Sequence, residues 1–193
     1  MARGTNQRRW FRVQALGTVR RPDTAGSAPG EYVDPWQEVV LDIDPRWEPA
    51  LEGIEGFSHL VVIFYLDRAK RRRRAGNPRP PEHEPDFPPV GLFATRTPER
   101  PNPIGISCPR LLRRDGHRLL VTGIDAWDGT PILDLKGYYP RDELRPDATV
   151  PAWLQELWQR HDRMRESPAS AGGTAEAGPL EQEKMTGDSS HSA

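Results

Sequence analysis

The sequence contains a single cysteine, Cys108, among its 193 residues. One thiol excludes an internal disulfide framework and a cysteine-based zinc site, and it fits a reducing compartment. Long apolar runs are also missing. The longest one, Leu60 to Leu66, is far shorter than the roughly twenty residues that cross a bilayer, and the N-terminus has no apolar signal-peptide core. From these absences we expect a soluble, cytoplasmic protein that is not associated with a membrane.

Several catalytic signatures are missing as well. No Gly-x-Gly-x-x-Gly or Walker-type motif follows a predicted strand, so the sequence does not support a Rossmann or P-loop nucleotide site. The Gly-x-Ser-x-Gly elbow of serine hydrolases does not occur either. His83 has carboxylates close to it in the sequence, but it lies in a charged, proline-rich stretch. We therefore interpret this stretch as a solvated loop and expect no metal site.

The charge is distributed unevenly along the chain. The whole chain has a formal net charge of -1, and residues 166 to 193 hold five acids and one base, so that residues 1 to 165 carry +3. The acidic C-terminal stretch has too few apolar residues to pack and should be disordered. We expect a flexible basic arm at residues 1 to 10, one folded domain at 11 to 162 and a disordered tail at 163 to 193.

The apolar patterns predict many short strands separated by turns. The run from 57 to 66 is apolar on both faces, which is typical of a central buried strand. An Asp-Gly pair at 115 and 116 predicts a hairpin. The fold class that follows is mainly β, a small β-barrel or strongly curved sheet with few short helices. Strands are expected at 11–19, 36–43, 57–66, 90–94, 104–112, 117–124 and 132–135, and helical turns at 45–51 and 150–158.

The loop from Phe93 to Ser107 is the most informative stretch. Prolines at 98, 101 and 103 fix φ and restrict the residues before them, so Arg100 and Asn102 are presented with little conformational freedom. A proline-rich surface turn is the simpler interpretation. Two arginines and one asparagine within this loop suit a carboxylate, a phosphate or a nucleobase edge, and they favour a binding loop.

Two further segments carry charged groups. Six positive charges lie between residues 68 and 74, and they suit a solvated surface and nucleic-acid phosphates equally well. The segment 125 to 138 holds three aspartates, one lysine and one tyrosine around an Asp-Gly turn and a short strand. Taken alone, this second segment predicts a turn with a surface ion pair.

Together, the segments 93–107 and 125–140 closely resemble the TrmO/TsaA-like family. The family pattern reads approximately Phe-Ala-Thr-Arg-Ser-Pro-x-Arg-Pro-Asn-Pro-Ile-Gly-Leu-Ser and, downstream, Asp-Gly-Thr-Pro-x-Leu-Asp-Ile-Lys-Pro-Tyr. The similarity extends over roughly residues 11 to 155. It implies a small β-barrel that binds S-adenosyl-L-methionine, commonly as a homodimer with sites near the subunit interface. It also implies a tRNA partner, with methylation of N6 of threonylcarbamoyladenosine at position 37 in the anticodon loop.

We expect roles for three groups of residues, the first two from the resemblance and the third from the charge of residues 68 to 74. The expected cofactor-binding residues are Arg96, Arg100, Asn102, Pro103, Ile104, Gly105, Asp125 and Asp128. The expected catalytic residues are Asp134, Lys136 and Tyr138, with Asp134 as the first choice to take the proton that leaves the acceptor nitrogen. The expected RNA-binding residues, which would contact phosphates, are Arg68, Lys70, Arg71, Arg72, Arg73 and Arg74.

The sequence also departs from the family pattern. Gly137 stands where the family usually has proline, and Asp67 stands where many members have histidine. The extra C-terminal domain of some members is absent here, from which we expect weaker or altered docking of tRNA. These departures leave open a methyltransferase of the same fold that acts on a small molecule. The positive charges at residues 68 to 74 leave open a non-catalytic RNA-binding module.

Overall fold

The computed structural model describes residues 10–22, 33–74 and 76–166. The chain divides into two compact units, residues 1–147 and 148–193, and the whole sheet belongs to the first. Within the described ranges, no helix has the length and apolarity of a membrane span, and no group of three potential ligands is gathered for a metal ion. Most of the expected basic arm and acidic tail lies outside these ranges.

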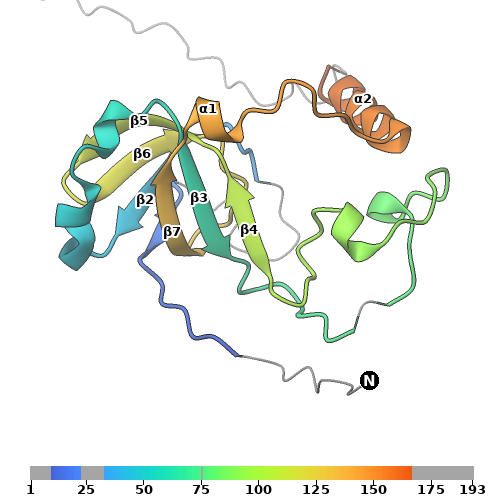
Figure 1. Ribbon diagram of the computed structural model, residues 1–193, viewed down its shortest axis with the longest axis horizontal. Coiled ribbons are helices and arrows are strands. Elements are labelled where there is room, and N and C mark those ends of the chain that lie inside the picture. Colours follow the sequence, from blue (N-terminus) through green and yellow to red (C-terminus); the bar gives the residue numbers. More distant parts are fainter. Residues whose placement is uncertain (1–9, 23–32, 75, 167–193) are drawn as a thin grey trace, which may run out of the picture. The chain divides into compact units, whose positions relative to one another are not determined.

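The first unit is built around one antiparallel sheet of seven strands in the order β4-β3-β7-β1-β2-β6-β5 (Figure 1). The strands are β1 (Gly17–Arg20), β2 (Val39–Ile43), β3 (Leu60–Tyr65), β4 (Ile104–Ser107), β5 (Arg110–Asp115), β6 (Arg118–Thr122) and β7 (Pro131–Gly137). Four short 3-10 helices interrupt the connections: η1 (Pro45–Leu51), η2 (Ile54–Gly56), η3 (Pro81–His83) and η4 (Leu92–Ala94). The α-helices are α1 (Pro140–Glu143) and, in the second unit, α2 (Ala152–Glu166).

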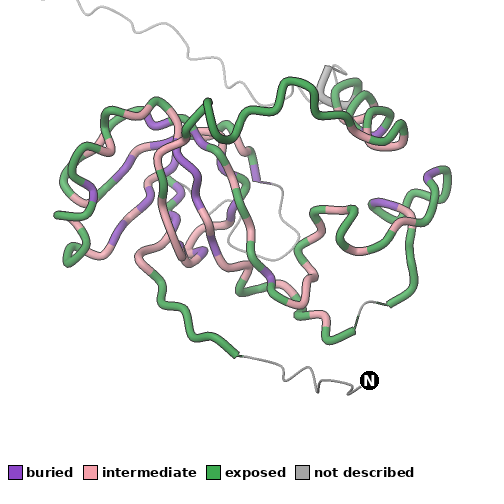
Figure 2. Tube along the Cα trace, viewed as in Figure 1, coloured by how far each residue is buried: buried purple, intermediate pink, exposed green. Residues whose placement is uncertain are grey.

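Alternating side chains of the strands form the core. Val39, Leu41 and Ile43 of β2 are buried, as are Leu119 and Val121 of the neighbouring β6. Burial is concentrated in the strands, whereas residues 10–15 and much of 67–100 are exposed (Figure 2). The core therefore belongs to the sheet, and long stretches of chain are left at the surface to form sites.

The sheet is strongly curved. An isolated bridge joins His59 to Arg110, the Leu60 N–H donates to the Pro109 carbonyl at 3.0 Å, and the Leu111 N–H donates to the Ser58 carbonyl at 2.9 Å. The beginning of β3 thus approaches the beginning of β5. Because only one bridge joins them, the sheet is not closed into a barrel. The predicted fold class, which allowed a strongly curved sheet, is confirmed.

Three strand predictions need correction. The strand expected at 11–19 begins only at Gly17, and the one expected at 104–112 is divided into β4 and β5, because Cys108 and Pro109 interrupt the ladder. The strand expected at 90–94 is wrong: Val90 forms one bridge with Arg79, and η4 follows.

The prediction that 57–66 is the central strand is also wrong. β3 is second from one end of the sheet, and β1 lies in the middle. The two faces of β3 are both apolar for different reasons. Leu60, Val62 and Phe64 face the core. Ile63 and Tyr65, on the other face, are half-buried and lie opposite Ile106 and Ile104 of β4. An apolar outer face next to a sheet edge had the same sequence pattern as burial on both sides.

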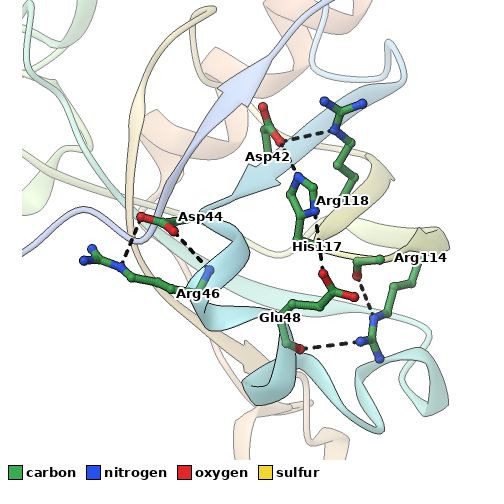
Figure 3. Close-up of polar contacts among 8 residues, drawn as sticks. Asp42, Asp44, Arg46, Glu48, Arg114, His117 and Arg118 are labelled. Carbon is green, nitrogen blue, oxygen red and sulfur yellow. Dashed lines mark hydrogen bonds and ion pairs between the residues drawn. The ribbon is translucent and has the colours of Figure 1, made fainter.

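The turns and helices follow the predictions more closely. Gly116 adopts φ 58° in the hairpin between β5 and β6, and η1 spans the expected residues, with the Asp44 side chain accepting from the Arg46 N–H at its start. A polar cluster joins η1 to this hairpin (Figure 3). His117 lies between Asp42, at 3.5 Å, and Glu48, at 3.8 Å, and the Arg114 guanidinium donates to the Glu48 carbonyl at 3.5 Å. These charged groups hold the hairpin against η1.

Candidate functional site

Two clefts border the loop 93–107. The first, here called the mixed-charge cleft, has a volume of about 950 Å³ and is lined by parts of β3, β4, the loop 93–100 and the segment 123–130. The second, here called the arginine cleft, has a volume of about 1470 Å³ and is lined by residues 10–15, 71–73 and 101–104, together with parts of β3 and β7. Ile104 lines both clefts.

Both signs of charge meet in the mixed-charge cleft. Its charged lining residues are Asp67, Arg68, Lys70, Arg96, Glu99, Arg100 and Asp125. Phe93, Ile106 and Trp127 add apolar surface. A cleft with this lining can hold a ligand that combines an aromatic group with positive and negative charges.

The loop that carries Arg96 and Arg100 is fixed by its own contacts. The Arg100 guanidinium donates to the Thr95 carbonyl at 2.9 Å and lies over the Phe93 ring at 5.7 Å, and the Thr95 hydroxyl donates to the Leu92 carbonyl. Arg96 is exposed and has no hydrogen-bond or ion-pair partner among the described residues. Its guanidinium is therefore available to a ligand of this cleft.

Arg21 supports the segment 123–130, parts of which line the mixed-charge cleft. Its side chain is buried, with 8% of the residue exposed, and donates to the carbonyls of Ala126 at 2.9 Å and Ile124 at 3.1 Å. The Arg21 N–H also donates to the Asp128 carboxylate at 3.0 Å. Burial lowers the pKa of the Arg21 guanidinium from its ordinary value, and the Asp125 carboxylate is the largest opposing influence. The segment 124–128 is thus built on a buried cation.

The arginine run, residues 68–74, contributes to both clefts and also bonds to loops of its own chain. Arg68 lines the mixed-charge cleft, donates to the Asp128 carbonyl at 3.1 Å and lies over the Trp127 ring at 5.8 Å. Arg71 donates to the Pro101 carbonyl at 2.7 Å, and Arg72 pairs with Glu99 at 3.5 Å. Half of the run therefore anchors the loops 99–101 and 127–128 of its own chain, a role that the charge pattern alone did not indicate.

The expected cofactor-binding residues are divided among three places. Arg96, Arg100, Ile104, Gly105 and Asp125 line the mixed-charge cleft. Asn102 and Pro103 line the arginine cleft. Asp128 lines neither cleft and accepts from Arg21.

The three expected catalytic residues line neither of these clefts. Asp134 and Lys136 form an ion pair with each other on β7, in register with Ile63 and Val61 of β3. The Tyr138 N–H donates to the His59 carbonyl at 3.0 Å, and its ring meets His59 edge to face. The binding loop and the first part of the downstream segment share a cleft in one chain, whereas the second part lies elsewhere.

Sequence reasoning missed several residues of these clefts. Arg21 gave no signal, because its role depends on contacts with residues more than a hundred positions away. Trp127 stood within a named segment without a role, and Cys108 was considered only for its redox chemistry. Trp10 was placed in the basic arm, although it stands beside basic residues as an exposed aromatic ring, a pattern that indicates nucleic-acid binding.

Gly137 has a packing reason for its place. A Cβ at this position would lie 2.6 Å from the Phe57 ring, so a larger residue requires Phe57 to move. The departure from the family pattern at this residue is thus accommodated by a local contact on β7.

Comparison with known proteins now decides the family. Residues 29–143 match the family model of the tRNA-methyltransferase O N-terminal domain. The chain belongs to the TrmO family. A probable S-adenosyl-L-methionine-binding protein of Methanothermobacter thermautotrophicus is 37% identical over 130 residues, which cover 67% of this chain and 90% of that protein. The tRNA (adenine(37)-N6)-methyltransferase of Escherichia coli is 33% identical over 148 residues, which cover 72% of this chain and 63% of that protein.

A solved structure agrees with this assignment. The crystal structure of TrmO from Pseudomonas aeruginosa matches with a TM-score of 0.56 and 26% identity, over 81% of this chain and 75% of that one. Some relatives are much longer. A probable S-adenosyl-L-methionine-binding protein of Archaeoglobus fulgidus is 37% identical over 145 residues, which cover 75% of this chain but only 38% of that protein. The predicted family is confirmed.

The lining of the mixed-charge cleft fits S-adenosyl-L-methionine, the cofactor after which TrmO relatives are named. That molecule carries a carboxylate, an ammonium, a sulfonium and an adenine ring. The cleft offers Arg96 to a carboxylate, Asp67 and Asp125 to positive groups, and Trp127 to an aromatic ring. The expected cofactor is thus supported by the family and by the charge of the cleft.

Proposed function

We propose that this TrmO-family chain is a cytoplasmic S-adenosyl-L-methionine-dependent tRNA methyltransferase. Its product is N6-methylated threonylcarbamoyladenosine at position 37 of the anticodon loop. The observation that carries the proposal is the mixed-charge cleft, which is lined by Arg96 and Arg100 of the loop 93–107 together with Asp125 of the downstream segment. The name of the E. coli relative supports the tRNA substrate and the N6 position.

In this proposal the cleft aligns a methyl donor that is already activated. Arg96 and Arg100 bind the donor's carboxylate, Asp125 binds its ammonium group or ribose, and Trp127 packs against its adenine. Transfer forms a bond from the methyl carbon to N6 of the acceptor and breaks the bond from that carbon to sulfur. N6 then loses one proton, which a carboxylate within hydrogen-bond reach accepts.

We propose that the chain acts as a homodimer, because Asp134, Lys136 and Tyr138 lie outside both clefts of a single chain. Ile104 and Ile106 of β4 are 47% and 54% exposed, and they stand opposite Tyr65 and Ile63 on β3. Packing of a second copy against Ile106 would cover part of this apolar face and leave Ile104, which lines both clefts, accessible. Such packing would also bring the β7 residues of one copy near the clefts of the other, where Asp134 would take the proton.

A small-molecule acceptor is the second candidate, and Asp67 is the observation that favours it. This carboxylate lines the mixed-charge cleft at the position where many family members have histidine. A negative group there suits a cationic acceptor better than it suits the carboxylate of threonylcarbamoyladenosine. Nucleoside mass spectrometry of tRNA from a strain lacking the gene separates the two: loss of the N6-methylated nucleoside supports tRNA, and its persistence supports the small molecule.

The variant Arg96→Ala tests the cleft itself. Removal of one charge-assisted contact should weaken binding of S-adenosyl-L-methionine about tenfold to a hundredfold, because such contacts contribute about 1.5 to 3 kcal/mol. Isothermal titration calorimetry measures the effect. Arg46→Ala is the matched control, since Arg46 is an exposed arginine that lines neither cleft. Equal affinities of the two variants would contradict the proposed cofactor site.

A further inference from the structure

The arginine cleft differs from the proposed cofactor site in its chemistry. Four arginines line it, Arg12, Arg71, Arg72 and Arg73, and none of the described residues that line it is acidic. The remaining lining is aromatic or apolar apart from Asn102. A cleft of this composition repels cationic ligands and attracts an extended anion that carries flat, apolar groups.

Trp10 and Phe11 present aromatic surface at this cleft. They are 74% and 77% exposed, although burial of a large aromatic side chain is the usual way to stabilise a fold. The Arg71 guanidinium lies over the Trp10 ring at 5.2 Å, and Arg71 also donates to the Pro101 carbonyl. The Trp10 ring and the Arg71 guanidinium are therefore held together at the surface. Arg71 is bonded to the loop 99–101, which also contributes to a wall of the mixed-charge cleft.

We infer that the arginine cleft binds the single-stranded RNA next to the nucleotide that is methylated. Trp10 stacks on one base of that strand, and Arg12 and Arg73 contact its phosphates. The combination of exposed ring, guanidinium plane and excess positive charge is the way in which proteins hold single-stranded nucleic acid. The identity of the strand rests on the proposed function, because the tRNA anticodon loop supplies the unpaired nucleotides on both sides of position 37.

Continuity between the two clefts supports this placement. Ile104 lines both of them, and the loop 99–101 joins their walls: Glu99 and Arg100 line the mixed-charge cleft, whereas Pro101 lines the arginine cleft. A strand that places one base in the mixed-charge cleft can continue into the arginine cleft. Arg72 is held by Glu99 at this boundary, so the run keeps its position relative to the loop.

Binding of an anticodon stem-loop RNA labelled with fluorescein tests the inference by fluorescence anisotropy. The variant Trp10→Ala should weaken binding about tenfold, the loss typical of one stacked base. The double variant Arg12→Gln/Arg73→Gln should reduce the slope of log K against log salt concentration by about two. Both variants should bind S-adenosyl-L-methionine as the unaltered chain does.

Trp47→Ala is the matched control. Trp47 is also a surface tryptophan beneath an arginine, with Arg46 at 5.5 Å, but it lines neither cleft. The control should keep the RNA affinity of the unaltered chain. Equal RNA affinity of Trp10→Ala and Trp47→Ala, with both variants folded by thermal melting, would overturn the inference. A change in oligomeric state of Trp10→Ala without loss of RNA affinity would assign the cleft to a second copy of the chain instead.

This test is separate from that of the proposed function. If the chain transfers no methyl group to tRNA but Trp10→Ala still weakens RNA binding, the arginine cleft stands and the assigned reaction fails. If methyl transfer occurs while the arginine-cleft variants bind RNA normally, the reaction stands and the inference fails. An RNA with abasic positions beside nucleotide 37 sharpens the result, since it should bind the unaltered chain and Trp10→Ala equally.

Discussion

The two clefts beside the loop 93–107 differ in how they are built. The mixed-charge cleft has both signs of charge, and one of its walls depends on a buried arginine that bonds to backbone carbonyls. The lining side chains of the arginine cleft have one sign of charge, and Trp10, Phe11 and Arg71 among them are exposed. This difference indicates that the mixed-charge cleft suits a compact ligand of fixed shape, whereas the arginine cleft suits a flexible polyanion.

The largest effect is expected when Arg21, the support of the mixed-charge cleft alone, is replaced. Arg21→Met leaves the buried carbonyls of Ile124 and Ala126 without donors and should reduce the free energy of unfolding by about 3 to 5 kcal/mol. Binding of S-adenosyl-L-methionine should fall with it. RNA binding in the arginine cleft should persist at temperatures where the protein stays folded.

Chemical denaturation and calorimetry measure these two effects. The neighbouring Arg20→Met is the control, because the Arg20 side chain is exposed and only approaches Asp42 at 4.0 Å. Its stability should change by less than about 0.5 kcal/mol. A similar loss in both variants would show that Arg21 has no special role in the mixed-charge cleft.

The second-largest effect is expected from a substitution in β4, because this strand lines both clefts. A Cβ on Gly105 would lie 2.6 Å from Cζ of the buried Phe64 ring. Gly105→Ala should therefore destabilise the chain by about 1 to 3 kcal/mol and weaken both ligands. Gly91→Ala is the matched control, because a Cβ there meets nothing within 4 Å. Thermal melting with both binding assays gives the answer, and loss of one ligand alone would contradict a shared wall.

The sequence predicted the turns better than the extent of the strands. Asp115 and Gly116 determine a hairpin locally, and the prolines of 93–107 determine a rigid loop, so these features could be read from short stretches. The outer face of β3 could not, since Ile63 and Tyr65 look like core residues until their partners on β4 are known. Strand position in a sheet depends on pairing between distant segments.

The candidate site was predictable to a similar extent. The family motifs led to Arg96, Arg100 and Asp125, which share a cleft, but not to the division between the two clefts. Asn102 is only two residues from Arg100 and yet lines the other cleft. Arg21 was not predictable, because its role comes from four side-chain hydrogen bonds, two of them to residues more than a hundred positions away.

The smallest expected effect concerns the thiol in the mixed-charge cleft. Partial burial and the Glu143 carboxylate raise the pKa of Cys108, while Arg96 opposes them. Alkylation by iodoacetamide should therefore rise with pH through a midpoint above that of an ordinary cysteine, because the thiolate is the reactive form. Arg96→Gln should move the midpoint further upward and slow the reaction a few-fold at pH 8.

Ligands distinguish the clefts in the same assay. S-adenosyl-L-methionine should protect Cys108, which lines the mixed-charge cleft, whereas the RNA stem-loop should protect it less. Equal protection by both ligands would indicate that the RNA covers the thiol as fully as the cofactor does, which the division between the two clefts does not predict.

A crystal structure with S-adenosylhomocysteine and the anticodon stem-loop would test the division of ligands between the two clefts. Density for the cofactor product is expected between Arg96 and Asp125, with a nucleobase stacked on Trp10 and its phosphates near Arg73. Cofactor density in the arginine cleft, or RNA bound on a face that includes neither cleft, would contradict this division.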